Sequence, residues 1–296
     1  MRKLFYLAQW FIRARFFGRR APLQTVLFIS DICNLRCKHC SVYELKNPHN
    51  MTYEQVREHL QYSYDQGSRF VDFEGGEVTI WKDGDKRIND LIALAKEIGF
   101  FSCTITTNAQ LPFKGSTADS IWVSLDGVNG YHEEVRGKGT FAKLEKNIAE
   151  CGHPHLSVNM VVNTLNYTAV DDTIEYAKNN PAIEQISINF HTPFEGTEYL
   201  ALDMEKRAEI IDRVIEYKKK GYPIMNSKSG LKLMKTGKFT KRCWVTNFIY
   251  PDGSRGLCVG HGTDKCNQCG FCMSGEMASV FAFKPDTIFA GLKLRT

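Results

Sequence analysis

Apolar and polar positions along the chain follow two different periods. Short apolar or alternating runs predict strands, and windows with apolar residues three and four positions apart predict amphipathic helices between them. The predicted strands are "TVLFIS" (25–30), "RFVDFEG" (69–75), "FFSCTITTN" (100–108), "SIWVSLDG" (120–127), "LSVNMVVN" (156–163) and "QISINFHT" (185–192). The predicted helices span 52–66, 87–99, 140–151, 169–179 and 203–221. This alternation indicates parallel βαβ units, and therefore an α/β barrel or a doubly wound sheet.

The pattern changes at both ends of the chain. Residues 1–22 predict a helix with a stripe formed by Arg2, Gln9, Arg13 and Arg20, while most other positions are apolar or aromatic. Such a helix lies either in a membrane interface or against the protein body with solvated arginines. Beyond Lys220 the chain is rich in Gly and Cys and shows little long helical periodicity. We therefore predict three parts: a basic helix over 1–22, an α/β domain over 23–222 and a small domain over 223–296.

Composition and charge narrow the class of protein. The 296 residues, 43% of them hydrophobic, suffice for one large core, and no apolar run reaches the roughly 20 residues of a spanning helix. Residues 1–30 hold six basic residues and no acidic one, and the other 32 basic residues are balanced by 33 acidic ones. Because no basic patch extends along the chain, we expect no nucleic-acid partner.

The N-terminus shows no cleavable signal, which bears on the ten cysteines. We expect a cytoplasmic protein whose thiols are reduced and serve metal binding or catalysis. The basic helix adds the alternative of peripheral attachment to the inner face of the membrane.

Three cysteines, Cys33, Cys37 and Cys40, follow the first predicted strand in a loop with cationic residues. Parallel α/β folds place their sites at such strand ends. Three thiolates can hold three irons of a [4Fe–4S] cubane and leave the fourth iron for another ligand, whereas an electron carrier usually supplies four cysteines. A structural zinc site or incidental thiols are the alternatives.

This spacing resembles the signature of the radical S-adenosylmethionine (radical SAM) superfamily. In that family the amino and carboxylate groups of SAM chelate the open iron, and reductive cleavage of SAM gives a 5′-deoxyadenosyl radical. The resemblance continues in order at the next strand ends, with "GGE" (75–77), "TTNA" (106–109) and "SLDG" (124–127), although Val78 stands where the family usually has proline. It implies a partial (β/α)6 barrel, open on one side. The SAM-binding residues that it implies are Gly75, Gly76, Glu77, Thr107, Asn108, Ser124, Asp126, Arg136 and Asn163.

A second group of cysteines occupies the C-terminal segment. Cys243 and Cys258 flank a "PDG" turn, which predicts a hairpin, and "CNQCGFC" follows. The spacing resembles the start of the SPASM and twitch domains, which carry auxiliary [4Fe–4S] clusters behind radical SAM barrels. A full SPASM domain uses seven cysteines for two clusters, so the resemblance implies one auxiliary cluster and one spare thiol here. The candidate ligands are Cys243, Cys258, Cys266, Cys269 and Cys272. A four-cysteine zinc site is the alternative.

The two remaining cysteines are not expected to act in catalysis. Cys103 alternates with residues that face the barrel interior and therefore points toward the helices, and Cys151 ends a predicted helix. Both are predicted to be core thiols.

The resemblance implies a radical SAM enzyme, an oxidoreductase or a transferase, that functionalises an unactivated C–H or C=C bond. The basic helix, and a likeness of "KCNQCGFC" to radical SAM enzymes that adenosylate hopanoids, favour a lipid or isoprenoid substrate at a membrane surface. The alternatives are a peptide-modifying maturase, a sugar or alcohol dehydrogenase of the twitch type, and a non-catalytic iron–sulfur or zinc module. A reductant such as flavodoxin or ferredoxin is the expected partner.

Overall fold

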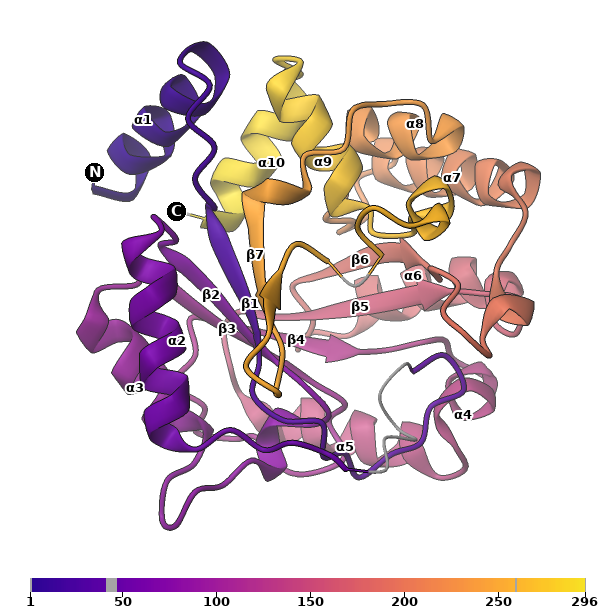
Figure 1. Ribbon diagram of the computed structural model, residues 1–296. Helices are drawn as coiled ribbons and strands as arrows, with labels where there is room; N and C mark the ends of the chain where they lie inside the picture. The colour runs from indigo at the N-terminus through magenta and orange to yellow at the C-terminus, as the bar shows by residue number, and fades with distance from the viewer. Residues whose placement is uncertain (1, 41–46, 259, 296) are drawn as a thin grey trace.

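A single curved sheet organises the protein. The computed structural model describes residues 2–40, 47–258 and 260–295. Its sheet has eight strands in the order β6-β5-β4-β3-β2-β1-β7-β8, with helices around its outer face (Figure 1). The strands are β1 Gln24–Phe28, β2 Phe70–Glu74, β3 Ser102–Thr107, β4 Ser120–Ser124, β5 Leu156–Val162, β6 Gln185–Phe190, β7 Thr246–Ile249 and β8 Arg255–Gly256. Every neighbouring pair is parallel except β7 and β8. The expected α/β class with a parallel sheet is confirmed, and all six predicted strands are present.

The predicted helices are present as α1 Arg2–Phe16, α2 Tyr53–Asp65, α3 Ile88–Ile98, α5 Thr140–Cys151, α6 Val170–Asn179 and α7 Met204–Lys219. The structure adds four helices that the periodicity did not predict: α4 Tyr131–Arg136, α8 Lys228–Thr236, α9 Met273–Phe281 and α10 Pro285–Arg295. Local signals fix several ends. Thr52 and Gln55 form a capping box at the start of α2, and Gly99 ends α3 in the left-handed conformation that glycine adopts without strain.

The two faces of the sheet differ in polarity. On β2, Val71 and Phe73 belong to the main core under the helices, whereas Asp72 and Glu74 alternate with them and face the barrel interior. Cys103 lies in the same core, with its Sγ 3.9 Å from the carbonyl oxygen of Ile92 on α3, and Cys151 joins it. Both predictions of core thiols are confirmed.

The C-terminal segment is more regular than its sequence pattern suggested. The sequence showed little long helical periodicity here, and the structure places three short helices, α8, α9 and α10, in this segment. These helices have only 9, 9 and 11 residues, too few for a clear period, and packing against one another stabilises them. The predicted hairpin is confirmed as β7 and β8, joined by a turn in which Gly253 N donates to Tyr250 O. β7 pairs in parallel with β1, so the segment also extends the barrel sheet.

The N-terminal helix α1 packs against the body of the protein through one face. Trp10 and Ala14 are buried, Tyr6 donates a hydrogen bond from its hydroxyl to Gly67 O, and Trp10 donates from Nε1 to Ala21 O. The packing alternative of the sequence analysis therefore holds for this face. Within the described residues, no helix is long and apolar enough to cross a membrane.

Candidate active site

The cysteine loop after β1 is held against the end of β2 by the "GGE" segment. Gly76 N donates to Ser30 O (2.6 Å) and Glu77 N donates to Ile32 O (2.9 Å). A Cβ atom on Gly76 would lie 2.1 Å from Ile32 O, and one on Gly75 would lie 2.5 Å from Ser30 O. Both positions therefore require glycine, because any side chain would push the cysteine loop off the strand.

Glu77 joins the ends of β2 and β3. Its buried carboxylate accepts hydrogen bonds from Thr107 Oγ1 (2.6 Å), from Asn108 N (2.7 Å) and from the backbone N of Thr79 (3.0 Å). These bonds fix the two strand ends relative to each other. Glu77 and Thr107 thus position the site, and their predicted contact with SAM stays a prediction.

Asn108 connects β3 to the cysteine loop. Its Nδ2 donates to Asn34 Oδ1 (2.7 Å) and points at Cys33 Sγ (3.7 Å), which also accepts from Leu35 N (3.4 Å). Burial raises the pKa of the Cys33 thiol, and the hydrogen bond from Leu35 opposes this shift. Two donors, Leu35 N and Asn108 Nδ2, thus point at the sulfur.

A buried ion pair lies beside Cys37. Arg136 Nε donates to Asp126 Oδ2 (2.6 Å), and Arg136 Nη1 points at Cys37 Sγ (3.8 Å). Burial raises the pKa of Cys37 to about 11 against the opposing effect of Arg136. Burial alone would raise the pKa of Asp126, but Arg136, His39, His132 and the hydrogen bond from Val161 N together hold that pKa below its usual value. The guanidinium therefore offsets negative charge on both the carboxylate and the sulfur.

His39, in the same cysteine loop, also lies beside Asp126. Its Nε2 lies 3.8 Å from Asp126 Oδ2, and burial lowers its pKa to about 4 although Asp126 opposes the shift. Among the described residues its Nδ1 has no hydrogen-bond partner. A buried ring nitrogen in this state is a polar atom that a bound group can satisfy.

The donors present fit an iron–sulfur cluster at Cys33, Cys37 and Cys40. Cys40 lies near enough to raise the pKa of both Cys33 and Cys37, so the three thiols share one electrostatic environment. Backbone, amide and guanidinium donors point at two of the sulfurs, and hydrogen bonds to sulfur are one of the ways a protein tunes a cluster. When bound, such a cluster supplies the electron for reductive cleavage of SAM.

Two further predicted SAM ligands lie at the expected strand ends. Ser124 is the last residue of β4, and Asn163 directly follows β5. Ser124 is half-buried and pairs in register with Asn159 on β5. Asn163 is buried and holds the following turn, because its Oδ1 accepts from Leu165 N (2.8 Å) and its Nδ2 donates to Val161 O (3.2 Å). Their contact with SAM stays a prediction.

Sequence reasoning missed the polar lining of the barrel interior. Glu74 pairs in register with Phe28, whose ring stacks on Tyr250 at 5.5 Å between centroids, and Asn189 Nδ2 donates to Asn159 Oδ1 (2.6 Å). Burial raises the pKa of Glu74 to about 7, with Asp72 adding to the shift and a hydrogen bond from Thr106 opposing it. The alternation in "FVDFE", "SVNMVV" and "ISINF" carried the signal, because its polar members share one face.

The C-terminal cysteines lie near one another but differ in burial. Cys243 and Cys258 share a thiol–thiol hydrogen bond that raises the pKa of Cys243, and Cys266 and Cys269 lie near enough to raise it further. Cys272 lies in the main core, where burial raises its pKa, Arg207 opposes the shift and the nearby Cys269 adds to it. Among the described residues, no three His, Cys, Asp or Glu side chains surround a single ion position.

Comparison with known proteins decides the family. The radical SAM superfamily matches residues 27–177, which is half of the chain. The chain belongs to the radical SAM superfamily. It is a radical SAM enzyme, and the family implies a [4Fe–4S] cluster and SAM as cofactors.

Among relatives of this radical SAM enzyme is the sporulation killing factor maturation protein SkfB of Bacillus subtilis (strain 168). It is 25% identical over 210 residues, which is 67% of this chain and 50% of SkfB. A GTP 3′,8-cyclase of Synechococcus elongatus is 29% identical over 183 residues, 55% of this chain and 53% of the cyclase. The chain thus spans about half the length of these curated relatives.

Solved radical SAM structures share the fold. Streptococcus suis SuiB bound to S-adenosylmethionine superimposes with a TM-score of 0.66 at 20% identity, over 83% of this chain and 62% of SuiB. The protein anSMEcpe, with bound AdoMet and a peptide, gives a TM-score of 0.62 at 18% identity, over 90% of this chain and 81% of that one. The parallel sheet and these neighbours agree with the expected partial barrel.

Proposed function

We propose that the protein is a radical SAM enzyme that modifies a peptide. The polar lining of the barrel beside the first cysteine loop carries this proposal. Two of the structural neighbours support it, since SuiB is known bound to its precursor peptide SuiA and anSMEcpe bound to a peptide. The relative SkfB is a maturation protein.

The lining matches a peptide better than a hydrocarbon. Glu74, Asn159 and Asn189 offer carboxylate and amide groups, and Phe28 and Tyr250 offer stacked aromatic faces. A peptide supplies amides and side chains that satisfy both kinds of surface. An isoprenoid offers no hydrogen-bond donor or acceptor to the further hydrogen-bonding capacity of these polar groups. The lipid or isoprenoid substrate favoured by the sequence gains no support from this interior.

The charge of the lining also separates a peptide from a nucleotide. Glu74 lies inside the barrel, and Asp72 on the same strand raises its pKa. Carboxylates in this place repel the polyphosphate of a nucleoside triphosphate and attract an ammonium or guanidinium group. In its ionised form, Glu74 therefore favours a peptide with a basic residue over the substrate of the GTP cyclases.

The C-terminal segment is proposed to hold an auxiliary [4Fe–4S] cluster in a twitch-like domain over 223–296. Cys243, Cys258, Cys266 and Cys269 are its proposed ligands, because Cys243 interacts with the other three, and Cys272, which lies near Cys269 but is buried in the main core, is the proposed spare thiol. Zinc at the same four thiols is the rival. The division into 1–22, 23–222 and 223–296, and a reductant such as flavodoxin or ferredoxin, are further parts of this proposal.

The proposed function is tested by the class of substrate that couples to SAM cleavage. The reconstituted enzyme is incubated anaerobically with SAM, dithionite and either a peptide fraction or a lipid extract of cells, and 5′-deoxyadenosine is measured. We expect the peptide fraction to stimulate 5′-deoxyadenosine formation and protease treatment of that fraction to abolish the stimulation. Stimulation by the protease-treated lipid extract alone would contradict the proposal and restore the lipid substrate.

We further propose that α1 brings the enzyme to the membrane surface. Phe5 and Phe17 are 72% and 71% exposed on a segment that carries basic and no acidic residues. Aromatic and cationic side chains on one exposed helix favour binding at an anionic membrane interface.

A further inference from the structure

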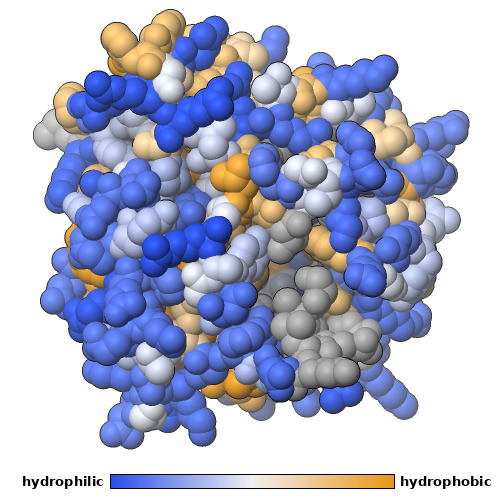
Figure 2. Space-filling model, in the orientation of Figure 1, coloured by the Kyte–Doolittle hydropathy of each residue, from blue (hydrophilic) through white to orange (hydrophobic). Residues whose placement is uncertain are grey.

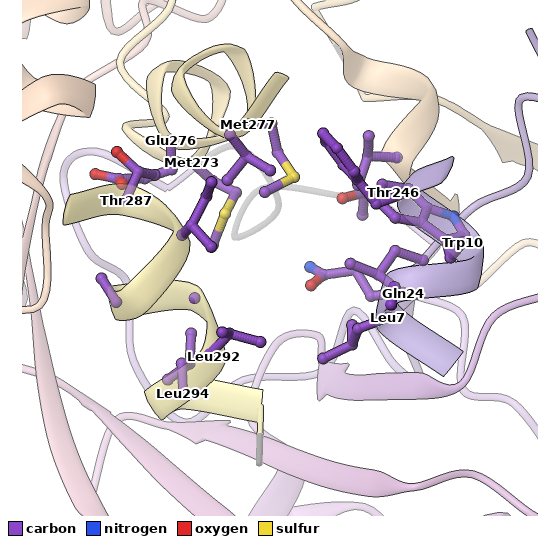
Figure 3. A pocket seen from close by; sticks show the side chains of 18 of the residues that line it. Leu7, Trp10, Gln24, Thr246, Met273, Glu276, Met277, Thr287, Leu292 and Leu294 are labelled. Atoms are coloured by element: carbon purple, nitrogen blue, oxygen red, sulfur yellow. The ribbon is translucent and has the colours of Figure 1, made fainter. Parts of the chain in front are cut away.

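A separate apolar cavity lies between α1, α9 and α10. It measures about 450 Å³, within the range of small-molecule sites, and Figure 3 shows Leu7 and Trp10 on one wall and Met273 and Met277 on the other. Gln24 and Thr246, the first residues of β1 and β7, reach its lining. The cavity therefore lies at the opposite end of the strands from the cysteine loop.

The few polar residues in the lining are already engaged within the protein. Glu276 Oε1 accepts from Ser227 N (2.9 Å), and Thr287 Oγ1 is 2.7 Å from Ser227 Oγ. Gln24 Nε2 donates to Asp72 Oδ2 (3.3 Å). The cavity thus offers a ligand mainly apolar contact.

The apolar surface continues from the cavity to the outside of the molecule. On α1, Leu4 and Phe11 line the cavity while Phe16, on the same helix, is 61% exposed. Phe283, in the turn before α10, stacks against both Phe11 and Phe16. Figure 2 shows apolar residues gathered beside strongly hydrophilic ones over α1, at the upper left. An exposed apolar patch that leads into an apolar cavity is typical of a binding surface.

Cationic side chains border this surface. Arg15 lies over the rings of Phe16 and Phe283, at 5.6 Å from each centroid. Arg13, Arg19 and Arg20 are exposed, and within the described residues none of them forms an ion pair with an acidic side chain. Their charge complements a phosphate group next to a hydrocarbon chain.

We propose that the cavity binds one acyl chain of an anionic phospholipid, with its phosphate at the arginines near the end of α1 and just after it. This inference rests on the proposed membrane contact of α1 and gives that contact its ligand. Met273 and Met277 suit such a guest, because the flexible thioether side chain adapts to chains of different shape. The lipid is proposed as an anchor and not as the substrate, since the cavity lies at the opposite end of the strands from the cysteine loop.

Trp10 allows a direct test, because it lines the cavity. The full chain is mixed with vesicles of phosphatidylglycerol whose acyl chains carry bromine, a contact quencher of tryptophan fluorescence. We expect quenching that is absent with brominated phosphatidylcholine and that falls in the Trp10→Phe variant. Co-sedimentation should weaken roughly fivefold for each arginine of Arg13, Arg19 and Arg20 that is replaced by Gln.

Gly291 supplies a matched pair of variants for the cavity itself. It lines the cavity, and a Cβ atom built on it meets no atom within 4 Å. Gly291→Phe is expected to fill the cavity and abolish the Trp10-specific quenching while co-sedimentation persists, whereas Gly291→Ala preserves both. Circular dichroism and thermal unfolding verify that each variant folds.

Two results would overturn the inference in distinguishable ways. Vesicle binding without Trp10 quenching, or quenching that survives in Gly291→Phe, would leave the membrane contact standing and refute the acyl-chain site. Absence of vesicle binding would refute both, and dimer formation on sedimentation would then assign the apolar face to a second copy of the chain.

Discussion

The surroundings of the sulfur atoms differ between the two groups of cysteines. The first places its sulfurs among donors, with Asn108 pointing at Cys33 and Arg136 at Cys37. In the second group the thiols contact one another, and the nearby Arg207 donates to the carbonyl oxygens of Gln268 and Cys269 instead of to a sulfur. A three-thiol set surrounded by donors suits a centre with an open position for a ligand. A four-thiol set suits a centre completed by the protein.

Both cysteine loops nevertheless pack on the ends of barrel strands through glycine residues. Gly75 and Gly76 let the first loop approach the end of β2, and a Cβ atom on Gly270 would lie 1.8 Å from Phe190 O at the end of β6. Cys272 N, in the second loop, donates to Asn189 Oδ1 inside the barrel. The difference between the centres therefore lies in what surrounds the sulfurs, because close packing on the barrel is common to both.

The largest effect is expected at the first centre. Cys37→Ala removes one of three thiolates from a site that has no spare, so 5′-deoxyadenosine formation from SAM and dithionite should fall to the detection limit. Cys151→Ser is the matched control, because it also removes one sulfur but from the hydrophobic core, and it should retain activity. Equal activity of Cys37→Ala and the parent enzyme would refute the claim that the first centre requires all three thiolates.

The ion pair that supports the first centre should dominate its stability. Asp126→Asn leaves Arg136 buried without its carboxylate, so we expect a loss of about 3–5 kcal/mol in the free energy of unfolding by urea. The control Glu134→Gln breaks the exposed pair of Lys38 and Glu134 and should cost about 0–1 kcal/mol. Similar losses of unfolding free energy in both variants would show that the buried pair of Asp126 and Arg136 stabilises the protein no more than an exposed pair does.

The carboxyl beside the first centre should make stability depend on pH. The pKa of Glu74 is raised to about 7 in the folded protein, so folding disfavours its ionised form. This penalty is absent below the unfolded pKa, grows as the pH rises toward 7 and is complete above it. Glu74→Gln should therefore be more stable than the parent at pH 8, by at most about 3 kcal/mol, and equal to it at pH 4.

Urea unfolding at both pH values measures this difference, with the exposed Glu97→Gln as control. A stability gain of Glu74→Gln that is the same at both pH values would refute the titration as its cause.

The smallest effect is expected at the spare thiol of the second group. Cys272→Ser should leave the iron content of the reconstituted enzyme unchanged, whereas Cys258→Ser should lower it by about half because one of two four-iron clusters is lost. Iron analysis of the two variants side by side makes this distinction. Loss of iron in Cys272→Ser would move that residue into the ligand set.

The sequence predicted the barrel well because its information is local. Alternation placed all six strands, and the spacing of Cys33, Cys37 and Cys40 with "GGE" indicated the loop that the structure shows docked on β2. The pairing of β7 with β1 joins residues far apart in the chain, which no local pattern encodes. The burial of Cys272 in the main core likewise depends on how the second loop folds onto β6.

The contents of the barrel were the main omission. Glu74, Asn159 and Asn189 stand in plain alternation, but their meaning appears only when the strands lie side by side and the residues share one lining. The assignment of Glu77 shows the reverse case. Its motif indicated a ligand-binding residue, and the structure shows a carboxylate occupied by Thr79, Thr107 and Asn108.

The central claim is that the chain holds two separate thiolate centres, one open and one closed by the protein. Iron and sulfide counts on the anaerobically reconstituted enzyme, on a Cys37→Ala/Cys40→Ala variant and on a Cys258→Ala/Cys266→Ala variant test it most directly. The account predicts about eight irons per chain in the parent and about four in each variant, with 5′-deoxyadenosine formation abolished in the first variant. About four irons in the parent, together with zinc that disappears in the second variant, would contradict an iron–sulfur cluster at the C-terminal cysteines.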